Sequence, residues 1–172
     1  KIVHQVRYGL EHSPEKDFFF ADGDIAFNRL VRDRMLLETK RRLPSIYPFV
    51  QSMYKGASGA WIYGLDDGIR RIVIEEGVTQ GCTLGSFLYS LATFPLVRAL
   101  QDILGGEASG NFTKFFVDDG NICADFDTMT RAITFIDEEG AKYGYFMKRN
   151  KGTYLLGSCG SYDRAMQKKQ YL

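Results

Sequence analysis

The chain has 172 residues, of which 45% are hydrophobic and 25% are charged, an ordinary composition for a globular protein. Lysine and arginine total 22 against 21 for aspartate and glutamate. The net charge of +1 therefore gives no reason of its own to expect nucleic acid or an anionic membrane as a partner. We find no internal repeat, low-complexity tract or linker, so we predict one domain.

The cysteines and the apolar stretches restrict where the protein acts. Cys82, Cys123 and Cys159 are odd in number and lack metal-ligand spacing, which favours an intracellular, reducing compartment, nucleus or cytoplasm. The most apolar stretch, residues 87–97, is too short to span a bilayer and predicts a buried helix, so we expect no membrane partner. The opening residues resemble the middle of a chain, and we expect an excerpt of a longer protein.

The first half of the chain predicts one strand, two helices and a hairpin. DFFFA, residues 17–21, is an aromatic run between polar residues and predicts a buried strand. Apolar residues at helical spacing predict helices over residues 26–41 and 46–54, with Pro44 between them. AWIYG and IRRIVIE predict two strands joined by a turn at residues 66–68.

The second half continues the mixture of helices and strands. A long apolar helix is predicted over residues 82–104, ended by two glycines. The strands FTKFF and ICA flank an Asp-Asp-Gly-Asn turn, a helix follows over residues 128–143, and TYLLG predicts a last strand. Because strands and helices do not alternate regularly, we predict an α+β fold, an antiparallel sheet with helices packed on one face.

Three aspartates fall where predicted strands end. Asp22 follows the first strand, and Asp118 and Asp119 lie at the tip of a hairpin. If these strands are neighbours, the carboxylates converge, and unit charges about 4 Å apart repel by about 4 kcal/mol at an effective dielectric near 20. Such a cluster needs a cation, and oxygen ligands without histidine or cysteine indicate Mg²⁺. We therefore predict a site for two Mg²⁺ ions, with Mn²⁺ as a substitute, suited to phosphoryl transfer.

The alternative is that Asp-Asp-Gly is only a turn, because aspartate and glycine satisfy turn geometry readily. The chain contains a second such triplet, Asp66-Asp67-Gly68, which we interpret as a solvated turn. That triplet lacks both the Phe-Phe-Val run before it and a partner carboxylate. The dipeptide alone therefore says little about function.

Four ordered stretches between Phe18 and Gly157 resemble the reverse transcriptases, most closely those of non-LTR retrotransposons and group II introns. They are ADGDIAFN, EEGVTQGCTLGSFLYSL, FVDD and YGYFMKRNKGTYLLG. The resemblance implies a polymerase palm with part of the fingers over residues 1–172, with the full fingers and the thumb missing. It also implies an RNA-directed DNA polymerase of a retroelement polyprotein, with an RNA template, a DNA or RNA primer and deoxynucleoside triphosphates. The excerpt alone is expected to be inactive.

The resemblance also implies which residues form the metal site. Asp22 and Asp118 would be the principal ligands, and Asp119 would be the second ligand of its pair. Gly23 would contribute only its backbone carbonyl. All three carboxylates that the resemblance assigns to the metal site are present in this sequence.

The nucleotide site is implied in the same way. Phe27 would lie under the sugar of the incoming nucleotide and exclude a 2′-hydroxyl, although as an isolated residue it would be assigned to a helix core. Gln80 and Gly81 would line the pocket for the nucleotide and the template base. Lys151 would lie near the triphosphate and protonate the leaving pyrophosphate, where the alternative is a solvated loop lysine.

Two other functions stay open. An RNA-directed RNA polymerase would share the metal site, but such enzymes commonly carry a second aspartate where this chain has Ala26 and Phe27. A domesticated, catalytically inactive copy would bind nucleic acid or a partner without incorporating nucleotides.

Overall fold

The computed structural model describes residues 2–65, 68–79, 81–106, 109–155 and 157. The chain divides into two compact units. The first unit comprises residues 1–24, 95–141 and 145–172, and the second comprises residues 25–94 and 142–144. The first unit therefore holds the candidate carboxylates, and the second holds Phe27.

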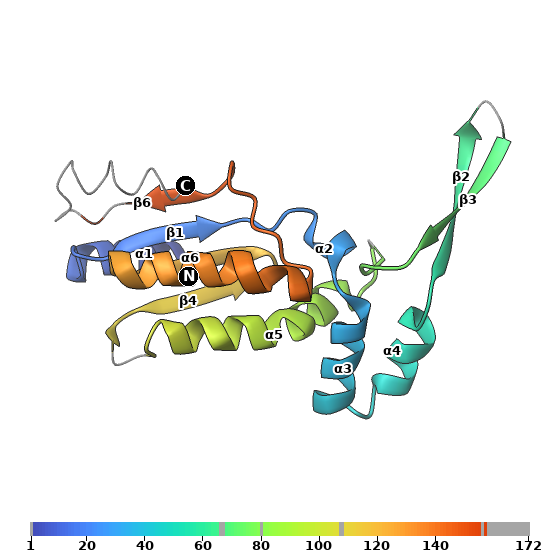
Figure 1. Cartoon of the computed structure of the whole chain (residues 1–172), viewed down its shortest axis with the longest axis horizontal. Helices are drawn as coiled ribbons and strands as arrows, with labels where there is room; N and C mark the ends of the chain where they lie inside the picture. The colour runs from blue at the N-terminus through green and yellow to red at the C-terminus, as the bar shows by residue number, and fades with distance from the viewer. Residues whose placement is uncertain (1, 66–67, 80, 107–108, 156, 158–172) are drawn as a thin grey trace. The chain divides into compact units, whose positions relative to one another are not determined.

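The first unit is built on a four-stranded antiparallel sheet with the order β4-β5-β1-β6 (Figure 1). The central strands are β1 (Asp17–Ala21) and β5 (Asp119–Ala124), and the edges are β4 (Phe112–Phe116) and β6 (Thr153–Leu155). The aromatic run of β1 and the apolar residues of β5 are buried, as expected for central strands.

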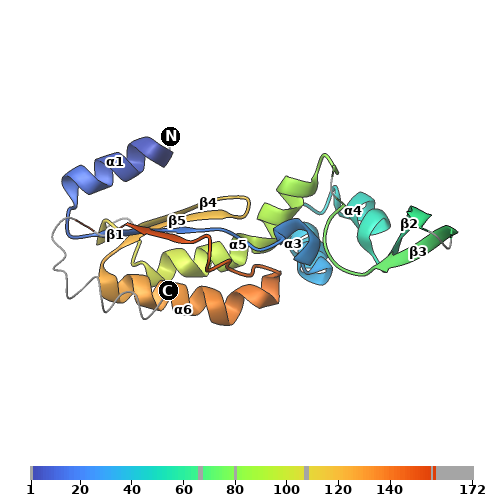
Figure 2. The same cartoon turned by 90° about the horizontal axis from the view of Figure 1, so that it is seen from above.

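Helices cover both faces of this sheet. The last turns of α5 (Gly85–Ile103) and the whole of α6 (Phe126–Glu139) lie on one face, and α1 (Ile2–His12) lies over the other (Figure 2). The predicted α+β fold with an antiparallel sheet and packed helices is confirmed, but the helices lie on both faces of the sheet and not on one (Figure 2). No element was predicted for the residues of α1, which packs so closely that a Cβ on Gly9 would lie 2.5 Å from Cζ of Phe18.

Helix α6 begins where its capping chemistry allows. Asp125 is the N-cap, and its carboxylate accepts a hydrogen bond of 3.0 Å from the backbone N–H of Thr128. The predicted helix over residues 128–143 therefore starts slightly earlier, and its last turn is the 3-10 helix Gly140–Tyr143. Its apolar face is buried, including Met129, Ala132 and Ile136.

The second unit contains three short helices, a two-stranded sheet and the first turns of α5. The helices are α2 (Ala26–Arg29), α3 (Arg32–Arg42) and α4 (Tyr47–Tyr54). The single helix predicted over residues 26–41 is wrong, because the chain is extended at Leu30, where φ is −58 and ψ is 127. The backbone carbonyl of Leu30 accepts a hydrogen bond of 2.8 Å from the N–H of Gly77, a tertiary contact that periodicity does not reveal.

The two-stranded sheet pairs β2 (Ser58–Leu65) with β3 (Gly68–Ile74), as the sequence predicts. Residues 66 and 67 of the predicted turn lie outside the described residues. Every residue of β3 is exposed, and exposed hydrophobic side chains occur on both strands, including Trp61, Tyr63, Ile69 and Val73. No helix in the described part of the chain is long and apolar enough to cross a membrane.

Candidate active site

The pairing of β1 with β5 brings Asp22 to the tip of the β4–β5 hairpin. Ala21 pairs with Gly120 at the end of the ladder, and the backbone N–H of Gly23 donates a hydrogen bond of 3.2 Å to the carbonyl of Asp118. The two strands are therefore neighbours in one sheet, which is the condition for the carboxylates to converge. All of these residues belong to the first unit.

The turn of the hairpin is shorter than the sequence predicts. Phe116 pairs with Asp119, so Asp119 is the first residue of β5 and the turn consists of Val117 and Asp118. Val117 has a φ of 60, in the left-handed region that a β-branched residue rarely adopts. Strained backbone of this kind costs about 1–3 kcal/mol and often marks a functional site.

Asp118 lies in an environment that opposes its ionisation. Burial raises the pKa of the Asp118 carboxyl above its usual range, and the negative charges of Asp119 and Asp22 raise it further. Its own backbone hydrogen bond and the positive charge of Lys151 act in the opposite direction on this pKa. The three aspartates therefore interact electrostatically, as a cation site requires.

Tyr145 supports the turn from inside the first unit, and the sequence analysis did not identify it. It is 2% exposed, and its hydroxyl donates a hydrogen bond of 3.2 Å to the backbone carbonyl of Asp118. Its ring packs edge-on against Phe115 with 5.7 Å between centroids. Burial, with the charges of Asp118, Asp22 and Asp119, raises the pKa of Tyr145, so the phenol stays protonated and donates. The sequence feature that could have indicated Tyr145 is its position directly after Gly144 in the fourth motif.

Two lysines of the fourth motif form ion pairs beside the turn. Nζ of Lys151 lies 3.3 Å from Oδ2 of Asp22, so Lys151 is not simply solvated. Nζ of Lys148 lies 3.3 Å from Oδ1 of Asp24, and the backbone N–H of Lys148 donates to the carbonyl of Asp22 at 2.7 Å. The segment around Met147 is thus attached to the backbone that carries Asp22.

An open cavity of about 360 Å³ lies at this end of the sheet. Its lining includes Asp22, Asp119 and Lys151, together with the exposed ring of Phe116. The cavity therefore places two carboxylates and one ammonium group around a space that a phosphate-bearing ligand can enter.

The donor set fits Mg²⁺ bound jointly by protein and substrate. In the described part of the chain, no three histidine, cysteine, aspartate or glutamate side chains lie close enough to hold an ion by themselves. Mg²⁺ in phosphoryl-transfer sites commonly uses one or two carboxylates and takes its other ligands from water and substrate phosphates. Asp22 and Asp118 supply two carboxylates of this kind, with the exposed Asp119 beside them, and their role as Mg²⁺ ligands stays a prediction.

The backbone carbonyl of Gly23 is available as a further oxygen ligand in this donor set. Gly23 forms an antiparallel bridge with Met147, whose hydrogen bonds run from Asp24 to Phe146 and from Lys148 to Asp22. These bonds do not use the carbonyl of Gly23. The prediction of Gly23 as a ligand stays a prediction.

The second unit brings the first two sequence motifs together around Phe27. Phe27 is half-buried, and its ring centroid lies 5.5 Å from that of the fully buried Tyr89 in α5. Its backbone carbonyl accepts a hydrogen bond of 2.8 Å from the N–H of Val78. A Cβ on Gly77 would lie 2.5 Å from the carbonyl oxygen of Asn28, so a glycine is needed for this close approach.

The roles predicted for Phe27, Gln80 and Gly81 at the nucleotide site stay predictions. Gln80 lies outside the described residues. Gly81 has a φ of 88, a conformation that suits glycine, and a Cβ there would meet no atom within 4 Å. The assignment of Gly81 to the nucleotide pocket stays a prediction.

Backbone strain occurs in both motifs that carry the predicted metal ligands. Within the described ranges, Ile25 and Val117 are the non-glycine residues with positive φ, at 49 and 60. Ile25 lies in ADGDIAFN and Val117 lies in FVDD. Both side chains are β-branched, so neither conformation is explained by local preference.

Comparison with known proteins supports the fold. No protein-family model and no curated protein matches the chain. Among solved structures, it is similar to apo telomerase from Candida tropicalis, with 16% identity over 93% of this chain and 32% of that chain and a TM-score of 0.72. It is also similar to telomerase from Candida albicans in complex with the TWJ fragment of telomeric RNA, with 12% identity over 93% and 31% of the two chains and a TM-score of 0.71.

The chain spans about a third of the length of these telomerase chains. At such low identity the likeness shows the fold alone. The chain therefore shares the α+β fold of the matched part of these telomerase chains. The retrotransposon or group II intron type is not distinguished by this likeness.

Proposed function

We propose that this chain is the palm, with part of the fingers, of an RNA-directed DNA polymerase. The observation that carries the proposal is the pairing of β1 with β5, which brings Asp22 to the hairpin tip that bears Asp118. The ordered motifs and the likeness to telomerase structures support it. An RNA template, a DNA or RNA primer and a retroelement origin are part of this proposal.

In the proposed reaction, the primer 3′-hydroxyl attacks the α-phosphate of a deoxynucleoside triphosphate, a new P–O bond forms and pyrophosphate leaves. Asp22 and Asp118 would hold Mg²⁺, assisted by Asp119 and the Gly23 carbonyl. Bound Mg²⁺ supplies charge neutralisation at the attacking and leaving oxygens. Lys151 is 58% exposed beside Asp22, so its ammonium group can reach a phosphate in the cavity and give a proton to the pyrophosphate.

Primer extension by a polymerase that contains this chain together with complete fingers and a thumb tests this proposal. We expect Asp118→Asn to lower the extension rate on an RNA template at least about 100-fold, because several kcal/mol of transition-state stabilisation would be lost. Asp127→Asn, on the exposed first turn of α6, is the matched control and should leave the rate unchanged. Undiminished extension after replacement of both Asp118 and Asp119 would refute the assignment.

Metal binding has a test that does not depend on activity. We expect Mn²⁺ to broaden the NMR signals of residues near Asp22 and Asp118 in the wild-type chain. Asp22→Asn and Asp118→Asn should each weaken this binding by about 10-fold or more, since each removes one of few charged ligands. Equal broadening in wild type and variants would show that these carboxylates do not bind the ion.

Phe27 provides the test of sugar selection. We expect Phe27→Ala to raise ribonucleotide incorporation relative to deoxynucleotide incorporation by about 10-fold or more, because the ring would no longer exclude a 2′-hydroxyl. A wild-type protein that already prefers ribonucleotides would indicate an RNA polymerase. Binding of primer and template without incorporation in Mg²⁺ or Mn²⁺ would indicate an inactive copy.

A further inference from the structure

The outer edge of β4 is a second region with features of a binding site. In the described part of the chain, β4 has a neighbouring strand only on its β5 side. The backbone groups that alternate away from β5 therefore point outward without a strand partner. An exposed edge of this kind is a template for pairing with another extended segment.

A cavity of about 420 Å³ runs beside this edge, and we call it the β4 groove. One wall is formed by the last turns of α5, which lies next to β4 (Figure 1), and the other by the strand. The lining residues used below are Arg98 and Asp102 from α5 and Asn111, Thr113 and Lys114 from the strand side. All belong to the first unit.

Two buried side-chain oxygens in the lining residues have no hydrogen-bond partner among the described residues: Oδ1 of Asn111 and Oγ1 of Thr113. The two residues are 8% and 5% exposed. Nδ2 of Asn111 donates to the carbonyl of Leu104 at 3.0 Å, which fixes the amide so that its oxygen remains the unpaired atom. Unpaired buried polar atoms of this kind are uncommon and call for a ligand or a bridging group.

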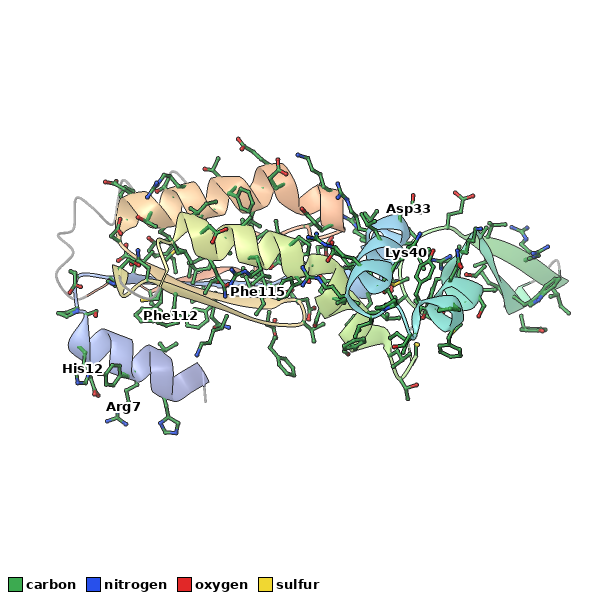
Figure 3. The ribbon with its side chains drawn as sticks, turned by 90° about the horizontal axis from the view of Figure 1, so that it is seen from below. Arg7, His12, Asp33, Lys40, Phe112 and Phe115 are labelled. Carbon is green, nitrogen blue, oxygen red and sulfur yellow. The ribbon has the colours of Figure 1, made fainter. Side chains whose placement is uncertain are left out.

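Asn111 and Thr113 lie on the same face of the strand, since alternate residues share a face. Phe112 lies on the opposite face, toward α1 (Figure 3). The unpaired oxygens therefore belong to the side of β4 that the α5 wall of the groove flanks.

The charges of the β4 groove restrict its occupant. Among the described lining residues, Arg98 and Lys114 outnumber Asp102, a balance that favours an acidic ligand. A second copy of the chain pairing through β4 would bring two Lys114 side chains onto adjacent strands, where like charges are destabilising. A phosphate group alone cannot pair with the outward backbone N–H and C=O groups along β4, as an extended segment does.

We propose that the β4 edge binds an extended acidic peptide segment as a fifth strand, with a carboxylate-bearing side chain in the β4 groove beside Arg98 and Lys114. A peptide offers both kinds of group that this edge can bind. Its backbone can pair with the outward N–H and C=O groups of β4, and its carboxylate can pair with the cations of the groove. This inference does not depend on polymerase activity.

Peptide titration followed by NMR tests the strand pairing. The probe is a capped seven-residue peptide of alternating threonine and valine with a central glutamate. We expect it to bind with a Kd below about 1 mM and to shift and protect the backbone amides of Thr113 and Phe115. Two further peptides carry N-methyl groups on the backbone amides of one edge or of the opposite edge. One of them should lose about 10-fold in affinity and the other should bind unchanged, because only one edge of the peptide pairs with β4.

A charge exchange tests the groove. Arg98→Glu should lower the affinity for the glutamate peptide by about 10-fold and raise the affinity for a peptide with lysine in place of the glutamate. Arg41→Glu, on the exposed surface of α3, should change neither affinity. Lys114→Glu serves the same purpose if Arg98→Glu does not fold. The proposal is overturned if the peptide does not bind at about 1 mM or if both N-methylated peptides bind equally. It is also overturned if Arg98→Glu and Arg41→Glu have equal effects, or if an oligouridine shifts the amides of Thr113 and Phe115 and the peptide does not.

Discussion

At the residue scale, the ionisation of Asp118 distinguishes a metal site from an ordinary acidic turn. The aspartate of a simple turn usually accepts hydrogen bonds and stabilises the fold when ionised. Here burial and two neighbouring carboxylates raise the pKa of Asp118. The structure therefore holds this carboxylate at a cost in stability, which a bound cation would remove.

We expect Asp118→Asn to raise the free energy of unfolding at neutral pH. Because the folded-state pKa of Asp118 is raised, its stabilising contribution is complete below the ordinary aspartate pKa of about 3.9 and is lost as the pH rises through the folded-state value. The increase in the free energy of unfolding caused by Asp118→Asn should therefore disappear at acidic pH. Thermal unfolding measured across this pH range checks the expectation.

The control for this prediction is Asp127→Asn, which should give no gain at neutral pH because Asp127 lies in the first turn of α6, where a negative charge is favourable. A lower stability of Asp118→Asn at neutral pH would indicate a capping aspartate in a simple turn. Mg²⁺ should reduce the difference between wild type and Asp118→Asn, since only the wild type retains the full ligand set.

The left-handed conformation of Val117 gives a second prediction at this scale. Val117→Gly should raise the free energy of unfolding by about 1 kcal/mol, because relief of about 1–3 kcal/mol of strain exceeds the entropic cost of glycine, about 0.5–1 kcal/mol. The same substitution at Val73, an exposed strand residue without positive φ, should lower stability. Denaturant titration of both variants makes the comparison, and a destabilised Val117→Gly would show that the turn is not strained.

At the element scale, the two-stranded sheet of β2 and β3 depends on one buried arginine. An isolated two-stranded hairpin is at best marginally stable in water. Arg32 is 6% exposed and donates to the backbone carbonyls of Gly56, Ile74 and Gly77 at 2.9, 3.1 and 2.9 Å. These carbonyls flank the hairpin on both sides, so Arg32 ties its base to α3.

We expect Arg32→Met to lower the free energy of unfolding by about 3 kcal/mol or more, because three carbonyls that a guanidinium satisfies would be left without it. Arg41→Met, an exposed position on the same helix, should change stability by no more than about 0.5 kcal/mol. Urea unfolding followed by circular dichroism measures both. A small effect at Arg32 would mean that water replaces the guanidinium at these carbonyls.

Elements that depend on local sequence patterns were predicted more accurately than those that depend on contacts between distant segments. The strand at residues 17–21 and the hairpin strands were predicted well, since period and turn chemistry are local. The break at Leu30 was not, because it depends on a hydrogen bond to Gly77. The two-residue turn at Val117 and Asp118 was also missed, because valine prefers extended strand conformations and here has a positive φ.

At the scale of the whole molecule, the two sheets differ in how deeply their strands are buried. In the first unit, residues 120–124 of β5 are buried, whereas every residue of β3 in the second unit is exposed. Local opening needs less free energy where little apolar surface is buried. The two units therefore have regions of very different local stability.

Hydrogen exchange should reproduce this difference. We expect the amides of β1 and β5 to be the slowest to exchange and those of β2 and β3 to exchange about 100-fold faster or more, which corresponds to about 3 kcal/mol in opening free energy. Mass spectrometry of peptides that cover each strand gives the measurement. Equal protection of β3 and β5 would show that the exposed hairpin is stabilised by contacts that this chain alone does not explain.

By itself the sequence determined the strands, the helices α4, α5 and α6, the order of the motifs and the identity of the acidic residues, because these depend on composition and spacing along the chain. Only the tertiary structure decided that Asp22 lies beside the hairpin tip, that Tyr145 supports the carbonyl of Asp118 from within, and that Arg32 is buried under the hairpin. Each of these depends on hydrogen bonds between segments far apart in the chain, which local patterns do not encode.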